Sequence, residues 1–205
     1  KNLRDLNGKP LISHSIEYAI SHNFDKKNIW VNTDDDQVIE LAKSYNISTY
    51  KRPAKLALDI TSTNDVLIDF SNFLNNKSYS HIITLQPTNP IRTKNLLTDA
   101  ISKLENIGTK SLMSVTLLNK KFGIIENDKY LPSNYKIGQR HQDMGHLYFE
   151  NGLIYISTKD AILNEKEYIT DDVYPYITDE IGSHIDIDYE SDLELAELIL
   201  KKIKI

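Results

Sequence analysis

Short β-rich segments alternate with amphipathic helical segments through the first half of the chain. The β-rich segments are Asn28–Asn32, Ile47–Tyr50, Ser80–Leu85 and Ser111–Leu117. Before and between them, apolar residues recur at helical spacing in Leu11–His22, Val38–Ala42, Val66–Leu74 and Lys94–Leu104. Because parallel strands need a crossover of roughly a helix in length, this alternation predicts an α/β fold with a mostly parallel sheet flanked by helices.

The alternation stops after Leu118. Phe122–Tyr130 is typical of a β-hairpin with Asn127-Asp128 at its turn, and Pro132–His146 is polar and irregular. No repeat or low-complexity linker divides the chain, so we expect a single domain over residues 1–205 with an arm at about 119–150. The remaining expected elements are a strand at Gly152–Ser157, a helix at Thr158–Leu163, short strands near Val173–Ile177 and Ile185–Ile187, and a final helix at Asp192–Ile203.

Composition excludes several classes of protein. The 24 Lys and Arg residues against 29 Asp and Glu residues give a formal net charge of −5, which argues against a nucleic-acid-binding surface. The absence of cysteine excludes a disulfide scaffold, a thiolate nucleophile and cysteine-ligated metal sites. No dinucleotide or P-loop glycine motif is present. Without a signal-peptide pattern or an apolar run of ~20 residues, we expect a cytoplasmic protein that makes no membrane contact.

An acidic pair stands near the end of the chain, in His184–Asp188. On an extended segment Asp186 and Asp188 share one face, and Ile185 and Ile187 share the other. Two adjacent carboxylates repel unless a cation or proton lies between them, and Mg²⁺ commonly takes one or two carboxylates together with phosphate and water. The pair is therefore either a metal site or a solvated edge strand in which Asp188 caps the last helix.

The loop Leu85–Arg92 (LQPTNPIR) follows a predicted strand, at the end where α/β sheets bind ligands. Its two prolines stiffen the loop, and the Gln86 amide offers both donors and acceptors. The alternative is a rigid connection in which Thr93 caps the next helix.

Two further polar segments have competing interpretations. The acids of Thr33–Asp36 could bind a metal, but acids also favour helix N-termini, and we favour capping of the following helix. In Gln139–Asp143, Arg140 suits a ligand carboxylate, while a plain surface loop explains the segment equally well.

Taken together, these segments resemble the CMP-sialic acid synthetases, the acylneuraminate cytidylyltransferase family. The similarity covers essentially the whole chain, and its more specific parts are Gln-Pro-Thr-x-Pro-x-Arg and Asp-Ile-Asp. The matching segments are Lys1–Ile12, Asn32–Asp35, Lys51–Ala57, Thr61–Thr63, Leu85–Arg92, Arg140–Asp143, Asn151–Tyr155 and Asp186–Asp188.

The resemblance implies a Rossmann-like nucleotide-binding sheet, a dimerisation arm and a homodimer. It also implies that CTP and a nine-carbon 2-keto sugar acid react to give the CMP-sugar and pyrophosphate, with Mg²⁺ as cofactor. The residues that it implies for catalysis are Lys1, Asp186 and Asp188, the two acids being the metal ligands. The residues that it implies for binding are Asn2, Arg52, Ser62 and Gln86 for the nucleotide, and Gln86, Arg140, His141, Asn151 and Tyr155 for the sugar.

Two departures from the family pattern bear on the site. The family's first strand and phosphate loop would precede Lys1, and we expect them in a segment outside this sequence. The family's usual Arg-Arg-Gln-Asp reads Arg140-His141-Gln142-Asp143 here, so His141 stands at the position expected for the sugar-carboxylate arginine. We favour Arg140 for this contact, because an arginine fork binds a carboxylate through two parallel hydrogen bonds.

The expected reaction is in-line attack of the sugar's C2 hydroxyl on the α-phosphorus of CTP, which requires positioning and charge neutralisation rather than a covalent intermediate. Two alternatives remain. One is a glycosyltransferase that uses Asp-x-Asp and Mg²⁺ to hold a sugar nucleotide, and the other is a nucleotide-binding module without catalysis.

Overall fold

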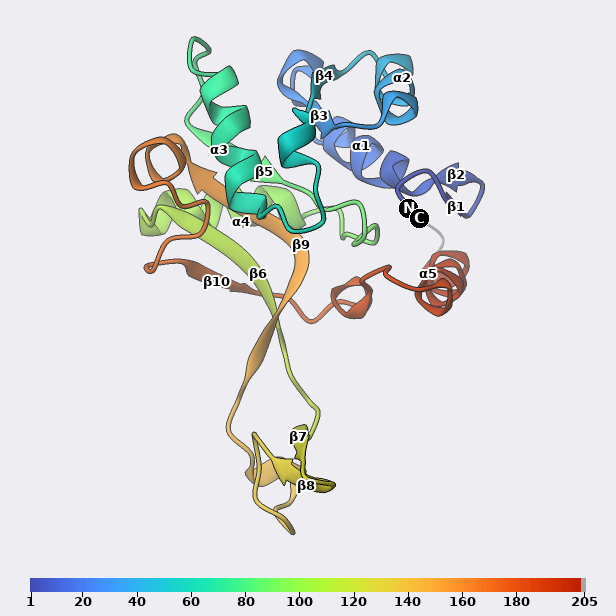
Figure 1. Ribbon diagram of the computed structural model, residues 1–205, viewed down its shortest axis with the longest axis vertical. Coiled ribbons are helices and arrows are strands. Elements are labelled where there is room, and N and C mark those ends of the chain that lie inside the picture. Colours follow the sequence, from blue (N-terminus) through green and yellow to red (C-terminus); the bar gives the residue numbers. More distant parts are fainter. Residues whose placement is uncertain (204–205) are drawn as a thin grey trace.

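A four-stranded sheet forms the centre of the structure, a computed structural model that describes residues 1–203 (Figure 1). The strand order is β10-β6-β9-β5. β10 is parallel to β6, whereas β9 is antiparallel to both β6 and β5. The strands are β5 (His81–Thr84), β6 (Ser111–Leu117), β9 (Tyr148–Thr158) and β10 (Tyr174–Ile177).

The α/β fold is confirmed, but the prediction of a mostly parallel sheet needs one correction. β5, β6 and β10 share a direction, and β9 runs against them. The reason is the connection between β6 and β9, which contains the arm and no crossover helix (Figure 1). A chain that turns back on itself in this way pairs antiparallel.

A second, two-stranded sheet pairs β3 (Trp30–Thr33) in parallel with β4 (Ser48–Lys51). The helix α2 (Asp36–Ser44) is the crossover between them, as the strand–helix alternation predicts. Near the N-terminus, β1 (Asp5–Leu6) and β2 (Lys9–Pro10) form a small hairpin that leads into α1 (Leu11–Ser21).

Helices cover the sheets by burying one apolar face each. Leu97 and Leu104 of α4 pack with Leu112 of β6 and Ile154 of β9. The other helices are α3 (Thr63–Phe73) and α5 (Glu190–Ile203), and α4 spans Leu96–Ile107. Short helical turns occupy Lys26–Asn28, Ala54–Leu56, His141–Asp143, Ala161–Glu165 and Ile181–His184. No helix in the described part of the chain is long and apolar enough to cross a membrane.

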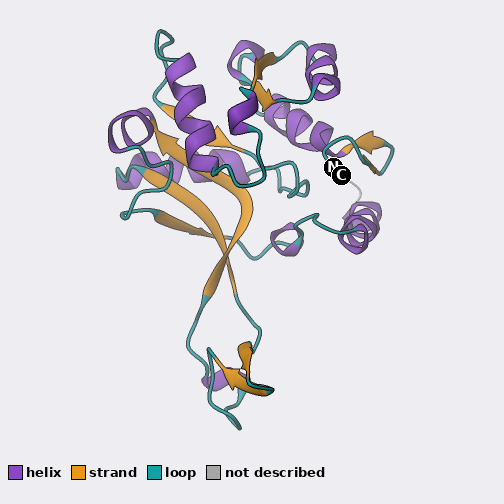
Figure 2. Cartoon of the chain, in the orientation of Figure 1, coloured by secondary structure: helices purple, strands orange, loops and turns teal. Residues whose placement is uncertain are grey.

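The arm extends away from the sheet, as Figures 1 and 2 show. The predicted hairpin is confirmed: β7 (Gly123–Glu126) pairs with β8 (Lys129–Pro132). Asn127 and Asp128 between them have φ values of 49° and 60°, as a two-residue type I′ turn requires. The arm exposes large apolar side chains, namely Phe122, Ile124, Ile125, Tyr130, Leu131, Ile137, Leu147 and Tyr148.

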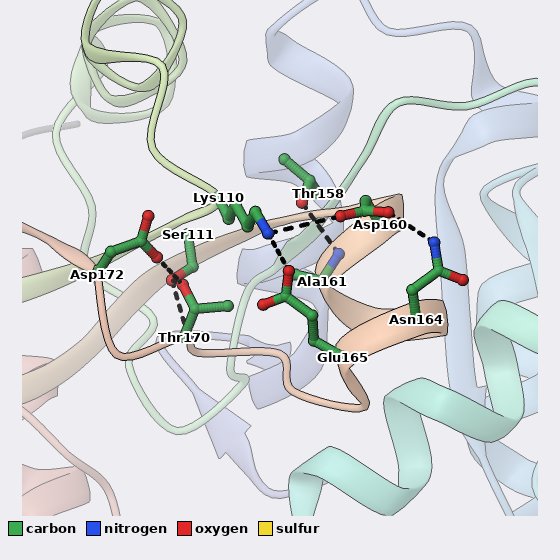
Figure 3. A network of polar contacts seen from close by, with 9 residues as sticks. All are labelled: Lys110, Ser111, Thr158, Asp160, Ala161, Asn164, Glu165, Thr170 and Asp172. Atoms are coloured by element: carbon green, nitrogen blue, oxygen red, sulfur yellow. Dashed lines mark hydrogen bonds and ion pairs between the residues drawn. The ribbon is translucent and has the colours of Figure 1, made fainter.

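The end of β9 is fastened to β6 by a polar network (Figure 3). Lys110 forms ion pairs with Glu165 and Asp160, while the Ser111 hydroxyl accepts the Thr170 backbone N–H at 3.0 Å. The helix expected at Thr158–Leu163 occurs as the short π-helical turn Ala161–Glu165. Lys110 precedes β6, and its two acidic partners follow β9. The network therefore holds together the chain segments at the ends of these two strands.

The acids after β3 cap a helix, as predicted. Asp35 Oδ1 accepts the backbone N–H groups of Gln37 at 2.8 Å and Val38 at 3.4 Å. Asp36 instead lies 2.6 Å from Lys51 Nζ on the surface.

We therefore expect Asp35→Ala to lower the free energy of unfolding by ~1 kcal/mol, because two N–H groups at the start of α2 lose their acceptor. Asp34→Ala is the matched control, since no hydrogen bond of the Asp34 side chain occurs within residues 1–203. Chemical denaturation followed by circular dichroism measures both. Equal losses for the two variants would contradict the capping role.

Candidate active site

The segment that contains Asp186 and Asp188 lies extended against the loop that follows β5. Ile187 N donates to Thr88 O at 2.9 Å. Ile185 and Ile187 are buried, at 3% and 1% exposure, while Asp186 and Asp188 are exposed. The predicted alternation is confirmed, but the strand expected near Ile185–Ile187 is wrong, because the segment bonds to a loop and pairs with no strand within residues 1–203.

A close backbone approach fixes this arrangement. A side chain at Gly182 would collide with the carbonyl oxygen of Ile91, so only glycine allows the turn Ile181–His184 to pack on the loop. Thr93 Oγ1 also donates to Glu180 Oε1 at 2.6 Å. The prediction that Thr93 caps the next helix is therefore wrong, since α4 begins after Asn95 and the Thr93 hydroxyl joins two loops.

Asp188 is free to receive a cation rather than to cap α5. Lys1 Nζ lies 2.5 Å from Asp188 Oδ1. Asp192 Oδ2, in the first turn of α5, accepts the backbone N–H groups of Asp188 and Tyr189 at 3.0 and 2.8 Å, whereas the Asp188 carboxylate accepts no N–H group of α5 within residues 1–203. The interpretation in which Asp188 caps the last helix is therefore wrong.

Arg92 holds the base of the Gln86 loop from inside the protein. Its Nε donates to Leu153 O at 2.7 Å, Nη1 to Ser15 Oγ at 3.0 Å and Nη2 to Gln86 O at 2.8 Å. Burial lowers the pKa of the Arg92 guanidinium to about 10, so it stays charged at neutral pH. No carboxylate pairs with it among the described residues. The loop is thus fixed to β9 and to α1 by one side chain.

The Gln86 side chain lies against a glycine that the structure requires. Gly152 has φ +73°, and a Cβ there would lie 2.7 Å from Gln86 Oε1 and collide with Asn89 Oδ1. Within residues 1–203 the Gln86 amide makes no hydrogen bond, and it is only partly buried. Its donors and acceptor are therefore unused by the described part of the chain.

Asn151 lies behind this surface. Its Nδ2 donates to Thr116 Oγ1 at 2.8 Å and to Thr178 Oγ1 at 2.6 Å. Its Oδ1 accepts from Ser114 Oγ at 2.5 Å and from Leu153 N at 3.1 Å. These four bonds use the full capacity of the amide. The structure therefore buries this predicted sugar-binding side chain inside the protein, with no free donor on it.

Tyr155 faces a carboxylate that the sequence analysis did not single out. Its hydroxyl donates to Glu150 Oε2 at 3.3 Å. Burial raises the pKa of Tyr155, the Glu150 charge raises it further, and Asp186 adds a smaller effect. Tyr155 therefore remains a protonated donor at neutral pH.

A β-bulge brings Glu150 and Tyr155 together. The pairing of β9 with β6 shifts between Met113 and Val115, which lie opposite Tyr155 and Glu150 respectively. A bulge changes which side chains share a face, so two residues five apart come together on one side of the strand. The signal in the sequence is Asn151-Gly152 inside an otherwise strand-like segment, since glycine in a strand often marks a bulge.

The predicted nucleotide residues Arg52 and Asn2 lie near the ends of β4 and the N-terminal segment. Arg52 follows β4, and its Nε and Nη2 donate to Oδ1 and to the carbonyl oxygen of Asn32, at 3.0 and 2.8 Å. Asn2 is partly buried, and its carbonyl oxygen accepts the Ile12 N–H at 3.0 Å. Ser62 caps α3, because its Oγ accepts the Asp65 N–H at 3.0 Å.

The arm residues are not brought to this site within one copy of the chain. Arg140 is 70% exposed and forms a bidentate pair with Asp143, at 2.7 and 3.0 Å. His141 begins the short turn His141–Asp143, where the backbone bends. Both residues belong to the arm, which extends away from the sheet (Figure 1).

Comparisons with known proteins identify the family of this chain. The chain is 34% identical to an N-acylneuraminate cytidylyltransferase of Streptococcus agalactiae over 86% of its own length, and it spans 44% of that protein. It therefore corresponds to less than half of this relative. It is 30% identical to a pseudaminic acid cytidylyltransferase of Campylobacter jejuni, over 98% of this chain and 89% of that one.

A solved structure of a CMP:2-keto-3-deoxy-manno-octonic acid synthetase complexed with CTP has the same fold. It superposes with a TM-score of 0.70 at 14% identity, and the match covers 99% of this chain and 92% of that one. The sequence pattern of the cytidylyltransferase family matches residues 1–204. The chain therefore belongs to the cytidylyltransferase family.

Proposed function

We propose that this protein transfers CMP from CTP to a nine-carbon 2-keto sugar acid of the sialic acid type, with release of pyrophosphate. The observation that carries the proposal is the contact between two polar segments at the end of β5. Ile187 N donates to Thr88 O, so the exposed acids Asp186 and Asp188 lie beside the loop that presents Gln86. Both relatives described above bear the names of cytidylyltransferases for sugar acids.

The residues divide the work by their chemistry. Arg52, held by Asn32, presents a fixed guanidinium toward the nucleoside side, while Lys1 supplies positive charge for the phosphates. Gln86 has an unused amide for hydrogen bonds to the sugar or the nucleotide. The protonated Tyr155 hydroxyl, which is bonded to Glu150, orients the sugar, and the buried Asn151 amide fixes the bulged part of β9 through its bonds to Thr116 and Thr178. Such positioning brings the C2 hydroxyl in line with the α-phosphorus.

Asp186 and Asp188 fit a Mg²⁺ ion. Both carboxylates are exposed, and Asp188 already attracts the ammonium group of Lys1 at 2.5 Å. Oxygen ligands of this type are those that Mg²⁺ prefers, with phosphate and water as its other ligands. When bound, the ion would neutralise phosphate charge and increase the acidity of the attacking hydroxyl.

We also propose that the protein is a homodimer. The arm exposes Ile125 at 78% and Ile137 at 81%, and an isolated hairpin with such an apolar surface is unstable unless it packs on a partner. In the dimer the arm of one copy lends Arg140 to the sugar carboxylate in the other copy. This explains why the arm leads away from the site of its own chain.

A pyrophosphate-release assay with CTP, Mg²⁺ and candidate sugar acids tests the reaction. We expect turnover in the unmodified protein and loss of turnover in Asp188→Ala. The loss in Asp186→Ala should be smaller, because we expect Asp186 to contact the ion mainly through a water molecule. The control is Asp171→Ala, which changes an exposed acid in the loop before β10 and should retain full activity. Unchanged Mg²⁺-dependent activity in Asp188→Ala would refute the metal assignment.

The same assay separates the other functions. A glycosyltransferase would consume a sugar nucleotide and release no pyrophosphate. A module without catalysis would bind CTP in calorimetry and show no turnover with any sugar acid.

For the sugar carboxylate, Arg140→Ala should raise KM for the sugar acid roughly tenfold or more, equivalent to ~1.4 kcal/mol, and leave KM for CTP nearly unchanged. The arginine fork makes two parallel hydrogen bonds to a carboxylate, which a neutral imidazole cannot replace. Steady-state kinetics with each substrate varied in turn gives both constants. If His141→Ala has this effect and Arg140→Ala does not, the histidine holds the carboxylate and the assignment of Arg140 is wrong.

Light scattering at micromolar concentration should report a dimer. A monomer under these conditions would contradict the shared site.

A further inference from the structure

We propose that Asn89 is a positioning residue that sets the distance between the sugar side of the site and its carboxylate segment. The inference rests on the proposed function, since it names what holds the two halves of that site together. Asn89 occupies the first of the two variable positions of Gln-Pro-Thr-x-Pro-x-Arg, so the motif itself does not identify it.

One side-chain amide joins three segments here. Asn89 Nδ2 donates to Asn151 O on β9 at 2.8 Å and to Ile185 O at 2.9 Å. Its Oδ1 accepts the Thr88 hydroxyl at 3.2 Å. Ile185 directly precedes Asp186, and Asn151 belongs to the bulge that brings Glu150 and Tyr155 together. The amide therefore links the segment of the acids to the strand that carries Tyr155.

Asn89 is enclosed by the protein and packs against Gly152. The residue is 1% exposed, so water cannot replace the two hydrogen bonds that it donates. The space where a Cβ of Gly152 would stand faces Asn89 Oδ1 directly. The Gly152 backbone therefore lies directly against the Asn89 amide, and a larger residue at either position would disturb this contact.

The amide group matters as well as the volume. Both of its N–H groups point at carbonyl oxygens, which can only accept hydrogen bonds. A carboxylate of the same shape would place an acceptor against these two carbonyls and repel them. Shortening the side chain would leave the carbonyls of Asn151 and Ile185 without partners in a buried position, which favours separation of the two segments.

The consequence for the site is a change in spacing without loss of any group that contacts a substrate. Asp186, Asp188, Gln86 and Tyr155 all remain, but the acids are no longer held at a fixed distance from β9. We expect metal use to suffer more than CTP binding on the Arg52 side, which is built on β3 and β4 and does not contact Asn89.

Asn89→Ala and Asn89→Asp test this, with Asn64→Ala as the matched control. Asn64 makes a similar bridge that involves neither the acid segment nor the Gln86 loop, with Nδ2 donating to Lys166 O at 2.7 Å and Oδ1 accepting Tyr168 N at 3.0 Å. In the pyrophosphate assay, both Asn89 variants should need roughly tenfold more Mg²⁺ for half-maximal rate, equivalent to ~1.4 kcal/mol. KM for CTP at saturating Mg²⁺ should change by a factor of about two at most, well below the change in the Mg²⁺ requirement. Asn64→Ala should leave the Mg²⁺ requirement unchanged.

Hydrogen exchange of the Ile187 amide gives a readout that does not depend on catalysis. Its bond to Thr88 O should open more often in Asn89→Ala and Asn89→Asp, while the same amide stays protected in Asn64→Ala. If Asn89→Ala does not fold, Asn89→Ser keeps one donor and replaces it in both measurements.

The outcomes separate the two proposals. Faster exchange at Ile187 in the Asn89 variants, in a protein that shows no turnover at all, would refute the proposed function and support the link between the segments. Unchanged exchange and an unchanged Mg²⁺ requirement in the Asn89 variants of an active enzyme would overturn the role of Asn89. A rise in the Mg²⁺ requirement that is equally large in Asn64→Ala would also overturn it, because the effect would then follow general destabilisation.

Discussion

The candidate site depends on a buried positive charge with no acid beside it in the described chain. The Arg92 guanidinium donates hydrogen bonds to the carbonyl oxygens of Leu153 and Gln86 and to the Ser15 hydroxyl. Burying a cation costs free energy unless polar groups surround it. Moving any of the three acceptors away would leave the buried charge poorly solvated, so the native positions of all three are favoured. The sheet, α1 and the Gln86 loop therefore keep one geometry, and the chain of contacts through Asn89 to the acids starts from this fixed loop.

Much of the fold follows from local patterns in the sequence. Helical spacing located α1, α2, α3 and α4, and the Asn127-Asp128 turn located the hairpin of the arm. The alternation of Ile185 and Ile187 with acids predicted which side chains face solvent, because burial on one side of an extended segment leaves a two-residue period even without a strand. These are properties of neighbouring residues, which a sequence shows directly.

The contacts between distant segments were not predictable in the same way. The direction of β9 depends on how the arm returns the chain, and Asp188 pairs with Lys1 from the opposite end of the chain instead of capping α5. Glu150 reaches Tyr155 only through a bulge in β9. Asn89 has an ordinary polar identity in a turn-rich loop, and nothing nearby in sequence indicates that its partners lie 62 and 96 residues away.

The polar residues of the site therefore form two groups with different physical tasks. Arg92, Asn89 and Asn151 are buried with their donors bonded to other parts of the chain, and their cost of burial is offset only in the native arrangement. Gln86, Asp186 and Asp188 keep oxygen or nitrogen atoms that ligands can reach. A sequence motif names members of both groups alike, because both are polar. The two groups are told apart only in the structure, where the polar atoms of one group bond to the protein itself and those of the other are open to a ligand.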